Sequence, residues 1–132
     1  MLGENDATAN LAVRDLDRAR RFYEDVLGLQ PVDEEGGEVV TYKSGASTIS
    51  VYRSEFAGTN KATAVTWQVT DIDAAVADLK KKGVAFEHYK MPEMKQEGDV
   101  YAAPDGHMRV AWFKDPDGNI LNLIAEPGAQ KH

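Results

Sequence analysis

The chain has 132 residues and no cysteine, which excludes disulfides, thiol nucleophiles and thiolate metal sites. Its formal net charge of −7 argues against binding to nucleic acid or an anionic membrane and mildly favours cationic ligands. The N-terminal MLGENDATAN lacks the basic and apolar regions of a signal peptide, and no apolar run is long enough to span a bilayer, so a cytoplasmic location is expected.

The first predicted elements are a strand and a helix. Residues 8–13 alternate polar and apolar side chains, as a half-buried strand does, and Asp15 follows as a candidate helix cap. Apolar residues at 3.6-residue spacing predict a helix over 16–27, and Gly28 suits a left-handed C-terminal cap. Two further strands are predicted at 39–43 and 48–52, on either side of the turn SGAS.

A second copy of this pattern begins 56 residues later, where residues 66–73 align with residues 10–17. A helix is predicted from Ile72 to the glycine at position 83, and the later strands recur at 110–114 and 120–124 around the turn DPDGN. The chain is therefore predicted to be one domain of two βαβββ modules, approximately 5–53 and 62–126, with a linker at 54–62.

This arrangement resembles the vicinal oxygen chelate superfamily, which includes glyoxalase I, extradiol dioxygenases, fosfomycin-resistance enzymes and bleomycin-resistance binding proteins. The motifs that carry the resemblance are LAVRDLDRARRFYEDVLGL, VTDIDAAVADLKKKGV and FKDPDGNILNL. The resemblance implies an α+β fold in which two tandem βαβββ modules form a cup-shaped mixed sheet. It also implies a homodimer and, in enzyme members, a metal held in the cup by the first and last strand of each module.

The four positions that correspond to the metal ligands of enzyme members hold poor donors. They are Thr8, Ser50, Ala64 and Asn122, where the family's enzymes carry His, Gln or Glu. Divalent transition metals prefer imidazole and carboxylate ligands to neutral hydroxyls and amides. We therefore expect no metal cofactor, and we interpret the asparagine that interrupts the last apolar strand as a former ligand position.

Without a metal, the resemblance favours a small-molecule binding protein of the bleomycin-resistance type, with an apolar or aromatic ligand in the cup. Strand alternation points these side chains toward the ligand: Thr8, Asn10, Ser50, Tyr52, Gln68, Tyr101, Trp112 and Asn122. The sequence also predicts a cluster of methionine and aromatic side chains around the loop at 91–99, made of Tyr89, Met91, Met94, Tyr101 and Trp112. Such a cluster indicates either an apolar cavity or ordinary core packing. The loop itself is either a lid or a simple connection.

Two enzyme alternatives stay open. A glyoxalase- or dioxygenase-like metalloenzyme with a divalent metal would need non-standard ligands, with His88 or His107 joining Glu87 or Glu97. A metal-independent isomerase or lyase would use His88 or a tyrosine as its base, and its pH–rate profile would then break near the pKa of that group. Whether the chain is an enzyme is therefore left open by its sequence.

The remaining candidates also have ordinary explanations. His107 follows a PDG sequence and fits a solvated hairpin turn, and His132 is the terminal residue. Arg53 and Arg109 either supply a cation for an anionic ligand or point to solvent.

Overall fold

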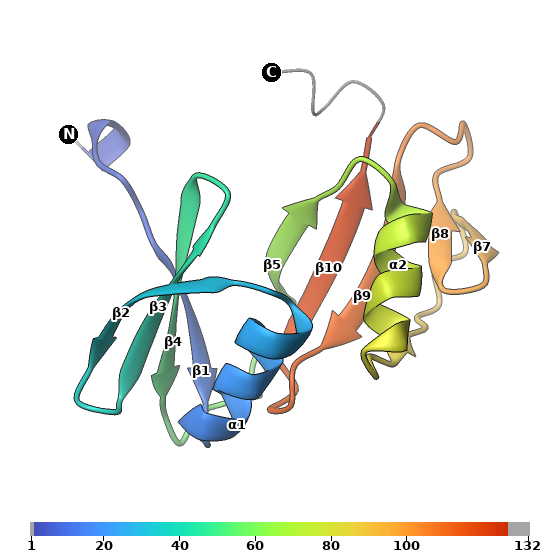
Figure 1. Ribbon diagram of the computed structural model, residues 1–132. Helices are drawn as coiled ribbons and strands as arrows, with labels where there is room; N and C mark the ends of the chain where they lie inside the picture. The colour runs from blue at the N-terminus through green and yellow to red at the C-terminus, as the bar shows by residue number, and fades with distance from the viewer. Residues whose placement is uncertain (1, 127–132) are drawn as a thin grey trace. The chain divides into compact units, whose positions relative to one another are not determined.

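The computed structural model describes residues 2–126, and it divides into two compact units. The first unit contains the chain up to Lys61 together with the turn Asp115–Asn119, and the second contains Ala62–Lys114 and the chain from Ile120 onward. Each unit begins with a strand and a helix and continues as a mixed sheet, so the fold is α+β as predicted (Figure 1). Within residues 2–126, no helix has both the length and the apolar character needed to cross a membrane.

A four-stranded sheet forms the first unit, in the order β1-β4-β3-β2. A short 3-10 helix, η1 (Leu2–Glu4), precedes it, and the strands are β1 (Ala9–Val13), β2 (Gln30–Glu35), β3 (Val39–Ser44) and β4 (Ser47–Arg53). β1 and β4 pair in parallel, and the other neighbours are antiparallel. The helical segment after β1 contributes Leu16, Ala19 and Tyr23 to the core of this unit.

The helix predicted over 16–27 is a regular α-helix only in its first part. α1 (Leu16–Arg20) is capped by Asp15, whose carboxylate accepts the Arg18 backbone N–H at 3.1 Å. The following residues, η2 (Arg21–Val26), form a π-helix, so the prediction of continuous 3.6-residue turns is wrong there. The π-helix contains Tyr23, which is fully buried and whose hydroxyl donates to Asp115 at 2.7 Å.

A six-stranded sheet forms the second unit, in the order β5-β10-β9-β8-β7, with β6 also pairing with β9. Its strands are β5 (Thr63–Gln68), β6 (Phe86–Glu87), β7 (Lys95–Glu97), β8 (Val100–Ala102), β9 (Arg109–Lys114) and β10 (Ile120–Ala125). α2 (Ile72–Lys81) is a regular helix capped by Asp71, and it lies over the sheet beside β9 and β10 (Figure 1). Phe113 anchors the core by stacking on Trp67, with 6.4 Å between ring centroids.

The strand pairings show which side chains share a face of each sheet. In the second sheet Thr66, Asn122 and Trp112 are direct partners across β5, β10 and β9. In the first sheet Asn10, Ser50 and Thr41 are direct partners across β1, β4 and β3. The residues that alternate with Ser50 on β4 and with Asn122 on β10 are buried, as the two-residue period of a strand predicts: Ile49, Val51, Leu121 and Leu123. The predicted strand alternation is therefore confirmed at these positions.

Candidate functional site

The second unit contains a cavity that opens to solvent. It is formed mainly by residues 88–99, which connect β6 to β8 and are called the cavity segment. The volume of the cavity is about 460 Å³, within the range typical of small-molecule sites. The residues that line it are Tyr89, Lys90, Met91, Pro92, Met94, Gln96 and Tyr101. Tyrosine rings and flexible methionine side chains give this lining an adaptable apolar surface.

A cluster of three aromatic residues supports the cavity wall. Tyr101 on β8 is buried, and its hydroxyl oxygen accepts the Tyr89 backbone N–H at 2.7 Å. Trp112 on β9 meets both tyrosines edge to face, with ring centroids 5.5 Å and 5.4 Å away. Burial raises the pKa of Tyr89, so this phenol stays protonated at neutral pH. The start of the cavity segment is thus fixed to the sheet by backbone bonding and ring packing.

The two ends of the cavity segment are joined by an ion-pair network. The Asp99 carboxylate lies 2.7 Å from Lys80 Nζ on α2 and 2.8 Å from His88 Nε2. The hydrogen bond from Lys80, followed by that from His88, lowers the pKa of Asp99. His88 therefore has a carboxylate partner that the sequence did not indicate, and it belongs to a surface network outside the cavity lining.

The eight side chains predicted to contact the ligand divide equally between the units. Thr8, Asn10, Ser50 and Tyr52 belong to the first unit, and Gln68, Tyr101, Trp112 and Asn122 belong to the second. Tyr101 lines the cavity, and Trp112 packs directly behind its wall. The other cavity residues were missing from that set, although the tyrosine and the two methionines between residues 89 and 94 had suggested an apolar cluster.

The positions that correspond to the family's metal ligands do not fit a divalent metal. Thr8 Oγ1 is bonded to the Thr48 hydroxyl at 2.9 Å, and Ser50 Oγ is bonded to the Thr41 hydroxyl at 3.2 Å. Asn122 is buried, and its amide oxygen has no hydrogen-bond partner among residues 2–126. One neutral oxygen is a weak substitute for the imidazole and carboxylate groups that such metals prefer. In the part of the chain that the structure describes, no three His, Asp or Glu side chains lie together so as to hold a metal ion.

Both arginines considered as anion-binding groups are paired with carboxylates. Arg53 bonds to Glu38 at 3.0 Å and 3.3 Å, and Arg109 bonds to Asp73 at 2.9 Å and 3.0 Å. The hydrogen bond from Arg109 lowers the pKa of Asp73. Each guanidinium group is therefore engaged by a carboxylate of the protein itself.

The remaining sequence candidates lie apart from the cavity lining. His107 occupies an exposed turn, where its backbone N–H donates to Asp105 at 2.9 Å. Glu87 on β6 lies 3.6 Å from Lys114 on β9. His132 falls outside the described residues.

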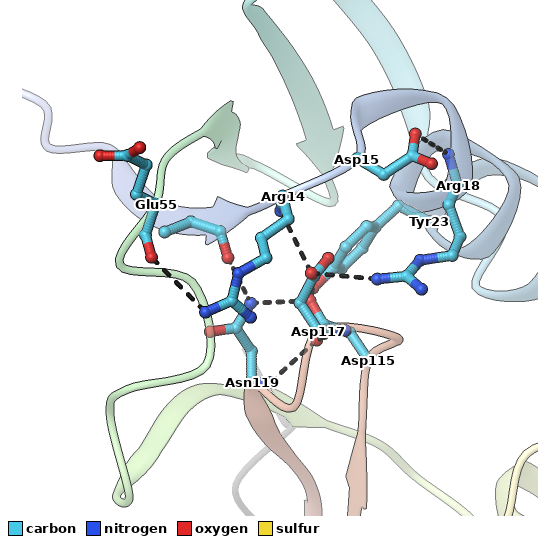
Figure 2. Close-up of polar contacts among 9 residues, drawn as sticks. Arg14, Asp15, Arg18, Tyr23, Glu55, Asp115, Asp117 and Asn119 are labelled. Carbon is cyan, nitrogen blue, oxygen red and sulfur yellow. Dashed lines mark hydrogen bonds and ion pairs between the residues drawn. The ribbon is translucent and has the colours of Figure 1, made fainter.

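The DPDGN turn forms a dense polar cluster within the first unit (Figure 2). One Asp115 carboxylate oxygen accepts the backbone N–H groups of Asp117 and Asn119, at 2.9 Å and 2.8 Å. The other oxygen accepts the Tyr23 hydroxyl at 2.7 Å and the Asn119 amide at 2.8 Å. Burial, assisted by the charge of Asp115, raises the pKa of Tyr23. The buried carboxylate of Asp115 is fully used in holding the turn.

A second set of bonds joins this turn to β1 and α1. Asp117 accepts the Arg14 backbone N–H and the Arg18 guanidinium, each at 3.1 Å, as Figure 2 shows. The Asn119 amide donates to the Ala12 carbonyl oxygen at 2.8 Å. Most of the turn's polar groups are thereby bonded within the protein, so we assign the turn a structural role.

Comparisons with known proteins agree with this architecture. The model of the family described as Glyoxalase/Bleomycin resistance protein/Dioxygenase superfamily matches residues 7–123. Lactoylglutathione lyase from Agrobacterium tumefaciens is similar in structure, with a TM-score of 0.71, 18% identity and 96% of each chain covered. TnmS3, an antibiotic binding protein from Streptomyces sp. CB03234, has a TM-score of 0.63 and 21% identity, with 92% of this chain and 95% of that chain covered.

A superfamily member from Sphaerobacter thermophilus DSM 20745 has a TM-score of 0.64 and 25% identity, with 92% of this chain and 97% of that chain covered. No curated protein sequence matches the chain.

Proposed function

Because the chain belongs to the glyoxalase/bleomycin resistance protein/dioxygenase superfamily, we propose that it is a small-molecule binding protein that holds an apolar or aromatic ligand without a metal. The observation that carries this proposal is the cavity of about 460 Å³, whose walls are largely tyrosine and methionine side chains. A binding role is compatible with the range of this fold, since TnmS3 is an antibiotic binding protein.

The metal-free part of the proposal rests on donor chemistry. The four positions discussed above offer two hydroxyls already bonded to neighbouring hydroxyls, one buried amide and one methyl group. The alternative, a metal-dependent glyoxalase- or dioxygenase-like enzyme, would have to recruit His88, whose imidazole is bonded to Asp99. Elemental analysis after incubation with Zn²⁺, Ni²⁺, Mn²⁺ or Fe²⁺ should find no stoichiometric metal. One metal per chain, lost in His88→Ala, would overturn this part of the proposal.

Ligand binding can be tested with a neutral aromatic probe, N-phenyl-1-naphthylamine. A Trp67→Phe background leaves Trp112, which contacts both cavity tyrosines, as the remaining tryptophan. We expect saturable quenching of its emission at one probe per chain. Met94→Gln keeps the approximate size of the side chain but makes the wall polar, and should weaken binding about fivefold, equivalent to about 1 kcal/mol of apolar contact.

Met108→Gln is the matched control, because Met108 is outside the cavity lining. It should leave probe affinity unchanged. Equal effects of the Met94 and Met108 changes, or no saturable binding, would contradict the proposed site. A metabolite ligand recovered chemically altered would instead favour a metal-independent isomerase or lyase.

We also propose a cytoplasmic homodimer, on the basis of the sequence and the family resemblance. Sedimentation velocity at several protein concentrations tests the assembly. A monomer at every concentration would contradict the dimer and would leave the cavity proposal intact, since the cavity lies within one unit.

A further inference from the structure

We propose that the cavity is selective for aromatic molecules that carry an anionic oxygen group, such as a carboxylate, sulfonate or phenolate. This inference rests on the proposed function and adds the charge of the ligand. It is drawn from the polar groups that border the cavity, chiefly Lys90 and Tyr101.

Lys90 supplies the charge. It is the one charged residue among the described residues that line the cavity. Lys90 is exposed, and within residues 2–126 the structure records no carboxylate partner for its ammonium group. Lys43, Lys61 and Lys81 share this state, whereas four other lysines each lie within ion-pair distance of an acid: Lys80, Lys82, Lys95 and Lys114. A cation beside an apolar wall attracts an anionic group locally, although the whole chain has a net charge of −7.

Tyr101 supplies a neutral donor. Its oxygen already accepts the Tyr89 N–H at 2.7 Å, so its own hydroxyl proton is left to donate. The structure records no acceptor for that proton among residues 2–126, and the buried Tyr89 hydroxyl of the same lining has no hydrogen-bond partner among those residues. A phenol and an ammonium group that line the same cavity suit an oxygen anion better than a neutral or cationic substituent.

The other polar lining residue, Gln96, offers no negative charge to a ligand. Its Nε2 donates to the Gly98 carbonyl oxygen at 3.0 Å, which ties the side chain to its own turn. No Asp or Glu occurs among the described lining residues. A cationic aromatic ligand would therefore meet Lys90 without a compensating carboxylate, and its binding should be disfavoured.

A matched pair of probes tests this inference on the full chain. 1-Anilinonaphthalene-8-sulfonate and N-phenyl-1-naphthylamine share one aromatic skeleton and differ by a sulfonate. We expect the sulfonate probe to bind more tightly. Lys90→Gln should weaken the sulfonate probe about threefold to fivefold, the range of a partly exposed ion pair, and change the neutral probe less than about twofold.

Lys95→Gln is the matched control, because Lys95 lies on β7 close to the cavity but outside its lining. It should leave both affinities unchanged. Tyr101→Phe keeps the ring and removes the hydroxyl, so it should weaken the sulfonate probe more than the neutral one. Met94→Gln should weaken both probes, which places both in the same cavity.

The outcomes separate this inference from the proposed function. If Lys90→Gln leaves the sulfonate probe unaffected, or if Lys95→Gln has an equal effect, selectivity for anions is overturned. Neutral-probe binding that still responds to Met94→Gln then preserves the proposed function. If the wild-type chain binds neither probe, both proposals are overturned.

Discussion

The two units begin with the same sequence pattern and diverge after the helix. In the first unit, η2 is followed directly by β2, β3 and β4, which complete the four-stranded sheet. In the second unit, α2 is followed by the short strand β6 and by residues 88–99, which include the edge strand β7, before β8 pairs with β9. The cavity is formed in that extra segment. The two copies thus share a backbone pattern, and the longer connection in the second copy provides the space for a binding site.

The side chains of the two sheets also differ in how readily a ligand could cover them. In the first unit, the Thr8 hydroxyl is bonded to that of Thr48, and the Ser50 hydroxyl is bonded to that of Thr41. On the second sheet, Trp112 packs against Tyr101 and presents ring surface. Apolar surface of this kind can be covered by a ligand at little desolvation cost, whereas satisfied hydroxyl pairs would have to be broken. This difference favours the second unit as the site of binding.

The largest expected effect comes from the buried turn of the first unit. Asp115→Ala removes a carboxylate that accepts four hydrogen bonds, including that from Tyr23, and leaves their donors buried. We expect the free energy of unfolding to fall by about 4 kcal/mol, measured by urea denaturation. Asp105→Ala is the control, because Asp105 lies in an exposed turn and accepts one backbone N–H. Similar losses for both variants would contradict the contrast between the turns.

A second large effect is expected where the first unit's backbone approaches the same turn. Gly58 has φ +74°, and a Cβ there would collide with the Asp117 carbonyl oxygen. Gly58→Ala should lower the free energy of unfolding by about 3 kcal/mol, combining left-handed strain with the clash. Gly98 has φ +67° with open space around it, so Gly98→Ala should cost only the strain, about 1 kcal/mol. Equal losses in urea denaturation would contradict close packing at Gly58.

The strands and α2 were predictable because they depend on local periodicity. Alternation of two residues placed Leu121 and Leu123 in the core, and 3.6-residue spacing with Asp71 as a cap marked α2. The π-helix was not predictable, since its residues show the same apolar spacing as an α-helix. Its buried Tyr23 bonds to a residue 92 positions away, and such a distant contact leaves no local signal.

The candidate site was predictable only in its composition. The sequence pointed to methionine and aromatic residues near position 90, and the cavity is built from them. The partner of His88 was not found, because Asp99 lies 11 residues away across a loop with no regular spacing. Strand alternation drew attention to the sheet faces, whereas the cavity is lined mainly by a connecting segment. Pattern-based reasoning is weakest for side chains on such segments.

A smaller effect, with a defined pH dependence, is expected for the ion-pair network that joins the ends of the cavity segment. Hydrogen bonds from Lys80 and His88 lower the pKa of Asp99 in the folded state. Its contribution is therefore present above the unfolded-state value, about 3.9, and is lost as the pH falls through the lower folded-state value. Asp99→Asn should lower the free energy of unfolding by about 0.5–1 kcal/mol at pH 6.

The difference between wild type and Asp99→Asn should narrow in urea titrations below about pH 4, where the unfolded-state carboxyl becomes protonated. Asp78→Asn is the control, because Asp78 forms an exposed pair with Lys82 at 3.4 Å within α2. Its effect should be smaller at both pH values. A difference for Asp99→Asn that is constant with pH would contradict a role for the charge.

The smallest expected effect tests whether the first sheet, where strand alternation predicted four ligand contacts, takes part in binding. Tyr52 lies on β4 in the first unit, is 37% exposed and belongs to the eight side chains predicted from strand alternation. If binding is confined to the second unit, Tyr52→Ser should change the affinity for N-phenyl-1-naphthylamine by less than about twofold, since exposed substitutions usually have little effect. A loss as large as that of Met94→Gln would show that the first sheet also contacts the ligand. The contrast between the units would then describe their stability and no longer the location of binding.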